Sequence, residues 1–567
     1  MKVKFYQPAL LSSLTLIPYI LSKIFNFNKN LTIITCIFIF LILISYKKLQ
    51  IKNKTFDNLI SRLNSINSVL YLVSLTIFIL ISQNFYLIYE IVTWDVPSYL
   101  VGSQEIGKGY LPFETQWESK GPLLTYIYYF FSYISGHSYI YFRVVSDIIL
   151  ILLTFFLFYY TYKVSNNKLI SSISSLVFAA MCSMRWYVSE YSEYFSLFFI
   201  ALAFIIFYRV EKTFKTLFVV GILIGISSLV NQASILFVLP YIIYSFDSWK
   251  TFYKSTIYLF IGGFLPHLIF ILLYTLNDML DIYISNYFSI PLGYSRDVSE
   301  SSIYEMRVWF REFYEFNKLI YFSLIGLIFG FIFEIKNNFS QRFILLKKDL
   351  VLLNILISIV IYFVGAHNYS HHLIYFIFFL PLLSLNISKN YLQISIAVLV
   401  FVGASSIFVK SYDTSIYNLR NLKNVENSYP LKKLSNEIRS NFNDDSFEIF
   451  ALDYLLILYY LEKTNYSYIV HPTNHFEDYI TNVLEKINKI EPDNVKKLLN
   501  EKPEVIICSP KRIHKGELFI NNEFSCDPET YYEEYYLLET EVFRTDPKLA
   551  YYWDPYKTIN VFVKLKK

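Results

Sequence analysis

The sequence predicts a polytopic α-helical membrane protein with a C-terminal α/β domain outside the cytoplasm. Hydrophobic residues make up 55% of the 567 residues and charged residues only 17%, whereas soluble domains carry about 25% charged residues. The apolar residues are gathered in blocks such as LTIITCIFIFLILIS, which run for about 15–20 residues, the length that crosses a bilayer core. The polar C-terminal part instead alternates helix and strand patterns, which is typical of an α/β domain.

About thirteen apolar segments are expected to span the membrane, with boundaries good to a few residues. The N-terminal stretch MKVKFYQPAL has the basic start of a signal peptide, but no A-x-A-like cleavage site precedes the next apolar run. A retained signal anchor is therefore expected. The expected spans lie near residues 8–25, 31–47, 69–90, 139–162, 169–184, 193–209, 217–230, 233–246, 255–276, 318–335, 350–366, 371–387 and 391–409.

The charge of the short loops predicts the orientation of these spans. Loops on one side are rich in Lys and Arg, as in Lys47, Lys48 and Arg62, whereas the opposite short loops contain little beyond Lys29 and Arg185. Because positive loops stay inside, the N-terminus is expected in the cytoplasm. An odd number of spans then places the C-terminal tail outside. The protein is expected to be a multi-pass protein of the inner or plasma membrane.

This orientation divides the chain into a transmembrane domain, residues 1–409, and a soluble domain outside the cytoplasm, residues 410–567. Two longer loops, 91–138 and 277–317, lie on the same outer face as the tail. The segment 123–135 is too short and too rich in tyrosine to span, so an interfacial helix is expected there.

The tail contains four expected strands, at FEIFAL, YSYIV, EVIIC and INVFVK. Helices that interleave with these strands are expected at YPLKKLSNEIRSNF, DYLLILYYLEK, HFEDYITNVLEKI and PDNVKKLL. Cys508 and Cys526 also lie in the tail and could pair if the compartment is oxidising, although two cysteines alone do not establish this.

Asp95 follows the third expected span, between Trp94 and Pro97. A lone loop carboxylate is most often solvated, but one held between an apolar wall and a cation can act as a general base toward a hydroxyl. Lys120 begins the expected interfacial helix. It is either a lysine that snorkels at the membrane edge or a point charge for a phosphate, helped by the free N–H groups of the helix start.

Further ionisable residues stand at the outer ends of spans. Arg143 and Asp147 are four residues apart, so they can neutralise one another, although charges in spans are also functional candidates. Glu190 and Glu193 precede or begin another span. One of the two glutamates could face the same cavity as Asp95.

His367, His371 and His372 lie together at the outer junction of two spans. Zinc sites usually need a carboxylate or cysteine partner, so hydrogen bonding to a phosphate or sugar is favoured over metal binding. Interfacial histidines without a function are the alternative. In the second outer loop Arg307 and Arg311 are one helical turn apart and either face one anionic group or pair with neighbouring glutamates.

The sequence contains no P-loop, no GxGxxG motif after a strand, no HExxH motif and no serine-triad signature. Nucleotide cofactors are therefore not indicated. No nucleic-acid partner is expected. An outer active site without nucleotides needs an activated donor that is delivered within the membrane.

The order of these residues carries a family resemblance. Asp95, Tyr99, GYLPF, KGPLL and Arg143 follow one another, and Glu193 and the block HNYSHHL come later. Over roughly residues 70–390 this order resembles the GT-C-fold, polyprenyl-phosphate-sugar-dependent glycosyltransferases, the superfamily of protein O-mannosyltransferases and lipid A aminoarabinose transferase. The chain departs from the family pattern at Val96, at Gly121 of Lys-Gly-Pro, and at Asn231-Gln232, where many members have lysine.

The resemblance implies inverting transfer of a sugar from a polyprenyl-phosphate donor to an acceptor hydroxyl at the outer face, with Asp95 as general base. The acceptor could be a glycan, a lipid or a protein. No metal ligand and no firm cofactor are implied, and a divalent cation stays open. The resemblance assigns donor-phosphate binding to Lys120, Arg143, His371 and Arg307, and substrate binding to Tyr99, Glu193, His367 and His372.

Two other functions share some of these sequence features. An O-antigen polymerase or ligase is also polytopic with outer Arg and His residues, but it gives no reason for the block from Asp95 to Lys120 or for the α/β tail. A flippase or transporter of lipid-linked glycans would have inverted repeats and charges near mid-membrane. The charges here lie at span ends instead.

Overall fold

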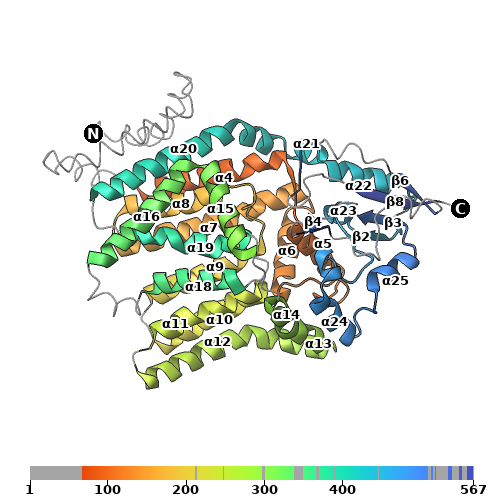
Figure 1. The fold of residues 1–567 in the computed structure, drawn as a ribbon, viewed down its shortest axis with the longest axis horizontal. Helices are drawn as coiled ribbons and strands as arrows, with labels where there is room; N and C mark the ends of the chain where they lie inside the picture. The colour runs from red at the N-terminus through yellow and green to blue at the C-terminus, as the bar shows by residue number, and fades with distance from the viewer. Residues whose placement is uncertain are drawn as a thin grey trace.

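The structure is a computed structural model in which helices lie side by side and a smaller helix–strand region covers one end of them (Figure 1). The expected spans 8–25 and 31–47 lie outside the described residues. The structure describes residues 67–210, 213–246, 248–296, 301–337, 349–364, 370–386, 390–444, 446–508, 513–514, 517–518, 534–538, 548–551 and 559–565.

The bundle coincides with the expected apolar segments that the structure describes. Within the part of the chain that the structure describes, five stretches are long and apolar enough to cross a membrane: Ser68–Ile88, Tyr139–Ser165, Ser192–Arg209, Trp249–Leu276 and Gln393–Arg420. The total of about thirteen spans remains a prediction. The bundle helices are α4 (Ser68–Asn84), α7 (Tyr139–Ser165), α8 (Lys168–Met181), α9 (Ser192–Arg209), α10 (Phe214–Val230), α11 (Val238–Tyr244), α12 (Trp249–Leu276), α16 (Lys318–Asn337), α18 (Leu350–Val364), α19 (Ile374–Phe379) and α20 (Asn390–Arg420).

Small residues allow α10 and α12 to pack closely. A Cβ atom added to Gly225 would lie 2.3 Å from the carbonyl oxygen of Gly263, and one added to Gly262 would lie 2.1 Å from that of Phe218. Close backbone approach at glycines is a common way for apolar helices to associate in a membrane. The end of α10, which borders the first outer loop, is thereby held in position.

The first outer loop is largely helical and lies between the bundle and the tail (Figure 1). Pro122 begins α6, where a missing N–H costs nothing. The helix expected at 123–135 is present as α6, and its interfacial position remains a prediction. The short helix η2 (Phe85–Ile88) ends the apolar stretch before this loop. The elements of the loop are β1 (Glu90–Val92), α5 (Asp95–Gly107) and α6 (Pro122–Ile134), and those of the second outer loop are α13 (Leu280–Ile284), η4 (Ser285–Ser289), α14 (Ile290–Arg296) and α15 (Ser301–Phe316).

The tail contains a sheet with the strand order β2-β3-β8-β6, in which β2 runs parallel to β3 and β8 runs antiparallel to both of its neighbours. Three of its strands fall within the expected FEIFAL, EVIIC and INVFVK. The strand expected at YSYIV is wrong, because this segment makes only an isolated bridge, between Ile469 and Trp117. The elements are α21 (Leu422–Asn427), α22 (Pro430–Ser440), β2 (Ile449–Ala451), α23 (Leu456–Leu461), η7 (Pro472–Phe476), α24 (Asp478–Lys486), α25 (Asn494–Asn500), β3 (Val505–Cys508), β4 (Ile513–His514), β5 (Glu517–Leu518), β6 (Tyr535–Leu538), β7 (Leu549–Tyr551) and β8 (Asn560–Lys564).

Backbone pairing joins the tail to the first outer loop. Strand β1 pairs in parallel with β7, and the Trp117 amide donates to the carbonyl of Tyr468 at 2.7 Å. The fully buried carboxylate of Glu90 accepts hydrogen bonds from the Leu431 amide and the Tyr460 hydroxyl, both at 2.8 Å. The predicted division at 409/410 remains a prediction, and α20 continues as one helix across it. The tail is therefore docked on the loop that contains Asp95.

Candidate active site

Asp95 is the first residue of α5, and side chains from three separate segments surround its carboxylate. The hydroxyl of Tyr99, one turn along α5, donates to Oδ1 at 3.3 Å. The Nε2 atom of His371, in η5 (Ser370–Leu373), lies 3.8 Å from Oδ2. The Nε2 atom of His471, from the tail, lies 3.6 Å from Oδ1. The Asp95 side chain retains 24% of its exposure, so a ligand can reach it.

The electrostatic environment keeps Asp95 ionised. Burial by itself raises the pKa of Asp95, but the neighbouring His471, His371 and Lys120 lower it, and the net pKa lies well below the ordinary value. Opposite charges within a few ångströms favour the charged form of a carboxyl group. Asp95 is thus a hydrogen-bond acceptor over the whole neutral pH range.

Lys120 lies next to a second carboxylate, that of Glu193 at the start of α9. Its Nζ atom is 3.4 Å from Oε1 of Glu193, which also accepts from Nδ2 of Asn231 at 3.0 Å. Burial lowers the pKa of Lys120, but Glu193, Asp95 and Glu118 raise it, and the net pKa is above the ordinary value. Lys120 is therefore a positive charge at neutral pH, 18% exposed, beside the Glu193 carboxylate.

The backbone on either side of Lys120 is held by the end of α10, by η3 (Gln232–Phe237) and by the second outer loop. The side-chain Nε2 of Gln232 donates to the backbone carbonyl of Ser119 at 2.6 Å, and Nδ2 of Asn286 donates to the backbone carbonyl of Lys120 at 2.9 Å. The Gly121 amide donates to the carbonyl of Val230 at 3.3 Å. These bonds fix the position from which the lysine side chain extends.

Gly121 leaves no room for a side chain, so Gly121→Ala is expected to displace this segment. An added Cβ atom would lie 2.1 Å from the carbonyl oxygen of Leu229, and backbone cannot yield as a flexible side chain does. We expect a loss of about 1–3 kcal/mol of stability together with impaired activity. Gly102→Ala is the matched control, because no atom lies within 4 Å of its added Cβ. Equal melting temperatures for the two variants would contradict the close packing at Gly121.

The structure brings together Asp95, Tyr99, Lys120 and Glu193 with His371 and His372, from the first outer loop, α9 and η5. Arg143 is engaged elsewhere: it is buried, its Nε atom lies 3.1 Å from Oε1 of Glu190, and its guanidinium donates to the carbonyls of Tyr89 and Tyr86. The expected pairing of Arg143 with Asp147 gives way to these contacts, since Asp147 accepts from Asn84 and Ser189 instead.

Two further predicted residues do not join the described cluster. Arg307 is exposed on α15, and its role toward a donor phosphate remains a prediction. His367 lies outside the described residues.

Sequence reasoning did not single out Glu118 and His471. Glu118 is buried in the same QWESKGP block, and its Oε1 atom accepts from the amide and hydroxyl of Ser119. Burial raises the pKa of Glu118, and the nearby charge of His471 offsets part of this rise. The position of Glu118 between Trp117 and Lys120 in the charged loop could have identified it from the sequence. No sequence feature identifies His471, because HPTNHFED has the pattern of a turn followed by the start of a helix.

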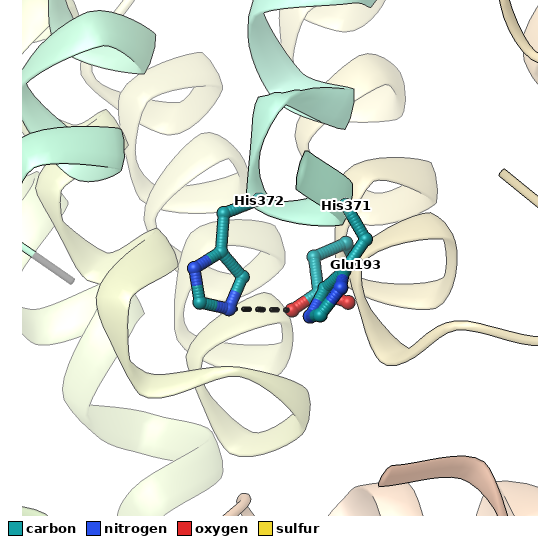
Figure 2. Close-up of side chains that lie close together, drawn as sticks. All are labelled: Glu193, His371 and His372. Atoms are coloured by element: carbon teal, nitrogen blue, oxygen red, sulfur yellow. Dashed lines mark ion pairs between the residues drawn. The ribbon is translucent and has the colours of Figure 1, made fainter. Parts of the chain in front are cut away.

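Glu193, His371 and His372 are the candidate metal ligands among the described residues. Their side chains point toward one another (Figure 2), and one ligand atom from each lies within 4.8 Å of the others. One carboxylate and two imidazoles form a recognised zinc donor set. The Glu193 oxygen nearest His372, however, already lies 3.4 Å from the Lys120 ammonium, which would repel a dication. These residues fit the lysine better than a metal ion.

The comparisons with known proteins rest on structure. No family model matches the sequence, and no curated protein matches it. The crystal structure of ArnT from Cupriavidus metallidurans bound to undecaprenyl phosphate matches with a TM-score of 0.55 and 11% identity, covering 87% of this chain and 97% of that one. The oligosaccharyltransferase of Archaeoglobus fulgidus in the apo form matches with a TM-score of 0.43 and 14% identity, covering 77% of this chain and 69% of that one.

ArnT is a lipid A aminoarabinose transferase and a GT-C-fold enzyme. The match runs over nearly its whole length, so it includes both the helical bundle and the region that follows it. At 11% identity the likeness establishes architecture alone. The protein described here has the GT-C fold, the fold of ArnT.

Proposed function

We propose that the protein is a membrane glycosyltransferase that moves a sugar from a polyprenyl-phosphate donor to an acceptor hydroxyl, with inversion at the anomeric carbon. The observation that carries this proposal is the meeting of an ionised, partly exposed carboxylate, Asp95, and a cation, Lys120, at one end of a GT-C-fold bundle. His371 connects the two groups, because it lies beside Asp95 and beside Glu193, the partner of Lys120. The fold supports a lipid-linked donor, since ArnT binds undecaprenyl phosphate.

Asp95 acts as the general base in this proposal. The acceptor hydroxyl donates a hydrogen bond to the Asp95 carboxylate, and its oxygen attacks the anomeric carbon on the face opposite the phosphate. As the new C–O bond forms, the hydroxyl proton becomes acidic and passes to Asp95. The low pKa of Asp95 suits a late proton transfer of this kind, because the carboxylate is always in its accepting form.

Lys120 stabilises the leaving group. The bond between the anomeric carbon and the phosphate oxygen breaks, and its electron pair stays on that oxygen, so the polyprenyl phosphate gains negative charge. A fixed cation at this position strengthens its interaction as the charge develops. Tyr99 and Glu193 would then orient the reacting groups. The prenyl chain stays in the lipid while its phosphate reaches headgroup depth.

The outer face of the cell or inner membrane is the proposed place of this reaction. The lysine-rich loops support a cytoplasmic N-terminus and an extracytoplasmic tail. The disulfide-bonded state of Cys508 supports the same side, because disulfides persist in oxidising compartments. Cys526, with which Cys508 could pair, lies outside the described residues. A reporter fused at residue 410 would appear cytoplasmic if this orientation is wrong.

The proposed function is tested by supplying a panel of polyprenyl-phosphate sugars to membrane extracts that contain the protein. We expect one member of the panel to transfer its sugar to a glycan, lipid or protein of the extract, and the acceptor to be identified by mass spectrometry. Nucleotide sugars serve as the control donors. Transfer from a nucleotide sugar in extracts depleted of polyprenyl phosphate would contradict the proposal.

Chelation of divalent cations is expected to leave this activity within about twofold of its starting value, because the Lys120 ammonium 3.4 Å from the Glu193 oxygen would repel a dication there. The measurement is the initial rate after dialysis against EDTA and after adding back Zn²⁺ or Mg²⁺. The contrary result is a rate that vanishes on chelation and returns with one cation. In that case Glu193, His371 and His372 would be its ligands.

A further inference from the structure

We propose that His471 of the tail is a positioning residue of the active site, which holds the Asp95 carboxylate in its reactive orientation. The tail thereby completes the catalytic centre. This inference rests on the proposed function and deepens it by assigning the tail a task within the reaction.

The backbone carries His471 to Asp95. Trp117 and Ile469 form a parallel bridge, with hydrogen bonds from the Trp117 amide to Tyr468 and from the Val470 amide to Trp117. The tail segment 468–471 therefore runs beside the loop segment 116–118. On the other side of Asp95, the Trp94 indole donates to Oδ1 of Asp453 in the tail at 3.1 Å. Two tail segments thus contact the loop, one at Trp94, directly before Asp95, and the other at residues 116–118.

The imidazole of His471 is itself oriented. The ring packs edge-on against Trp94, with centroids 6.1 Å apart, and its Nδ1 atom is 3.0 Å from the hydroxyl of Thr473. If the Thr473 hydroxyl donates to Nδ1, the proton of the neutral ring sits on Nε2. That nitrogen faces Oδ1 of Asp95 at 3.6 Å. A hydroxyl that fixes the tautomer of a histidine beside a carboxylate is a familiar way to orient catalytic groups.

Several charged and titratable groups face Asp95, and His471 has a particular place among them. Tyr99 approaches Oδ1 from α5 and His371 approaches Oδ2 from η5, while Lys120 and Glu118 act from the rest of the loop. Among the interactions that lower the pKa of Asp95, the contact with His471, at 3.6 Å, is the largest. Loss of His471 should therefore both loosen Asp95 and raise its pKa.

The experiment compares His471→Ala, His471→Gln and Thr473→Val with the wild-type protein. We expect His471→Ala to lower kcat about tenfold to a hundredfold with little change in donor KM, because misplacing a catalytic group costs up to about 100-fold. The acid limb of its pH–rate profile should move to higher pH, since Asp95 then protonates more readily. Gln places an amide donor near the position of Nε2, so His471→Gln should recover part of the rate. Thr481→Val, in which the lost hydroxyl contacts only a helix carbonyl, is the matched control for Thr473→Val.

A second readout does not depend on activity. Carbodiimide modifies protonated carboxyl groups, and peptide mapping reports the labelling of Asp95 as pH falls. Labelling should begin at a higher pH in His471→Ala and Thr473→Val than in the wild type and Thr481→Val. Unchanged labelling and an unchanged pH profile in folded variants would overturn the inference. Failure of the wild type to use any lipid-phosphate sugar would overturn the proposed function but leave the labelling result valid. If His471→Ala does not fold, Thr473→Val decides by the same two readouts.

Discussion

Asp95→Asn should lower sugar transfer about a thousandfold, because general base catalysis contributes about 10²–10⁴-fold. Asparagine has nearly the shape of aspartate and still accepts a hydrogen bond from Tyr99, but it takes no proton from the acceptor hydroxyl. It also removes the negative charge beside which His371 and His471 lie. Binding of the donor should change far less than the rate, since Lys120 keeps its place beside Glu193.

The measurement is a pair of values for each variant, the initial rate of transfer and the donor affinity. Glu114→Gln is the matched control, because Glu114 is an exposed carboxylate of the same outer loop and accepts only a local backbone hydrogen bond. We expect this control to retain full activity. An Asp95→Asn protein that works at more than a third of the wild-type rate would remove Asp95 as the base.

Lys120→Met has the second largest expected effect, about a 100-fold to 1000-fold loss in kcat, the size found when one group that stabilises developing negative charge is removed. Donor affinity should also fall. The change removes the lysine beside the Glu193 carboxylate, which is 1% exposed and keeps its hydrogen bond from Asn231. Removing one partner of a buried ion pair costs up to about 3–5 kcal/mol, so this single variant will also be less stable.

A double variant separates the two consequences. Lys120→Met combined with Glu193→Gln removes both charges, and Asn231 can still donate to the glutamine side-chain oxygen. We expect the double variant to regain stability but not transfer. Lys108→Ala is the control for loss of a lysine in this region, because Lys108 is an exposed partner of Glu105. Recovery of transfer in the double variant would mean that Lys120 has only a structural role.

Local patterns predicted the parts of the molecule that depend on local physics. Apolar runs such as 139–162 and 193–209 gave α7 and α9 to within a few residues, because a bilayer demands long apolar segments with internally satisfied backbones. The loop from Asp95 to Lys120 stood out because charge and turn residues directly follow a span. The β2, β3 and β8 strands are short, buried and apolar, which makes them visible in a single sequence.

Contacts between segments that are distant in the sequence could not be predicted from the sequence. His471 meets Asp95 only because a backbone bridge joins the tail to the loop, and Trp94 and Asp453 are 359 residues apart. The partner of Arg143 was missed for a related reason. The i,i+4 spacing suggested Asp147 as the partner, but Glu190, 47 residues further along the chain, forms the ion pair with the Arg143 guanidinium. The helical spacing of residues in a sequence does not show which of several carboxylates the fold places next to one arginine.

Gly121 shows how a departure from the pattern of the glycosyltransferases that the sequence resembles has a physical reason. Those proteins often have proline where this chain has Gly121, and here the backbone of α10 lies too close for any side chain. Gln232, which stands near a position often occupied by lysine, holds the Ser119 carbonyl instead. The backbone that carries Lys120 is thus held in place by the close packing at Gly121 and by the side-chain amides of Gln232 and Asn286.

The release of free polyprenyl phosphate is the measurement that most directly tests the account. Purified protein in vesicles would receive the polyprenyl-phosphate sugar and acceptor found in the panel assay, and the lipid product would be identified by mass spectrometry. We predict one polyprenyl phosphate released for each sugar transferred by the wild type, and about a thousandfold slower release by Asp95→Asn. Sugar transfer without release of polyprenyl phosphate, or equal release by the two proteins, would contradict the account.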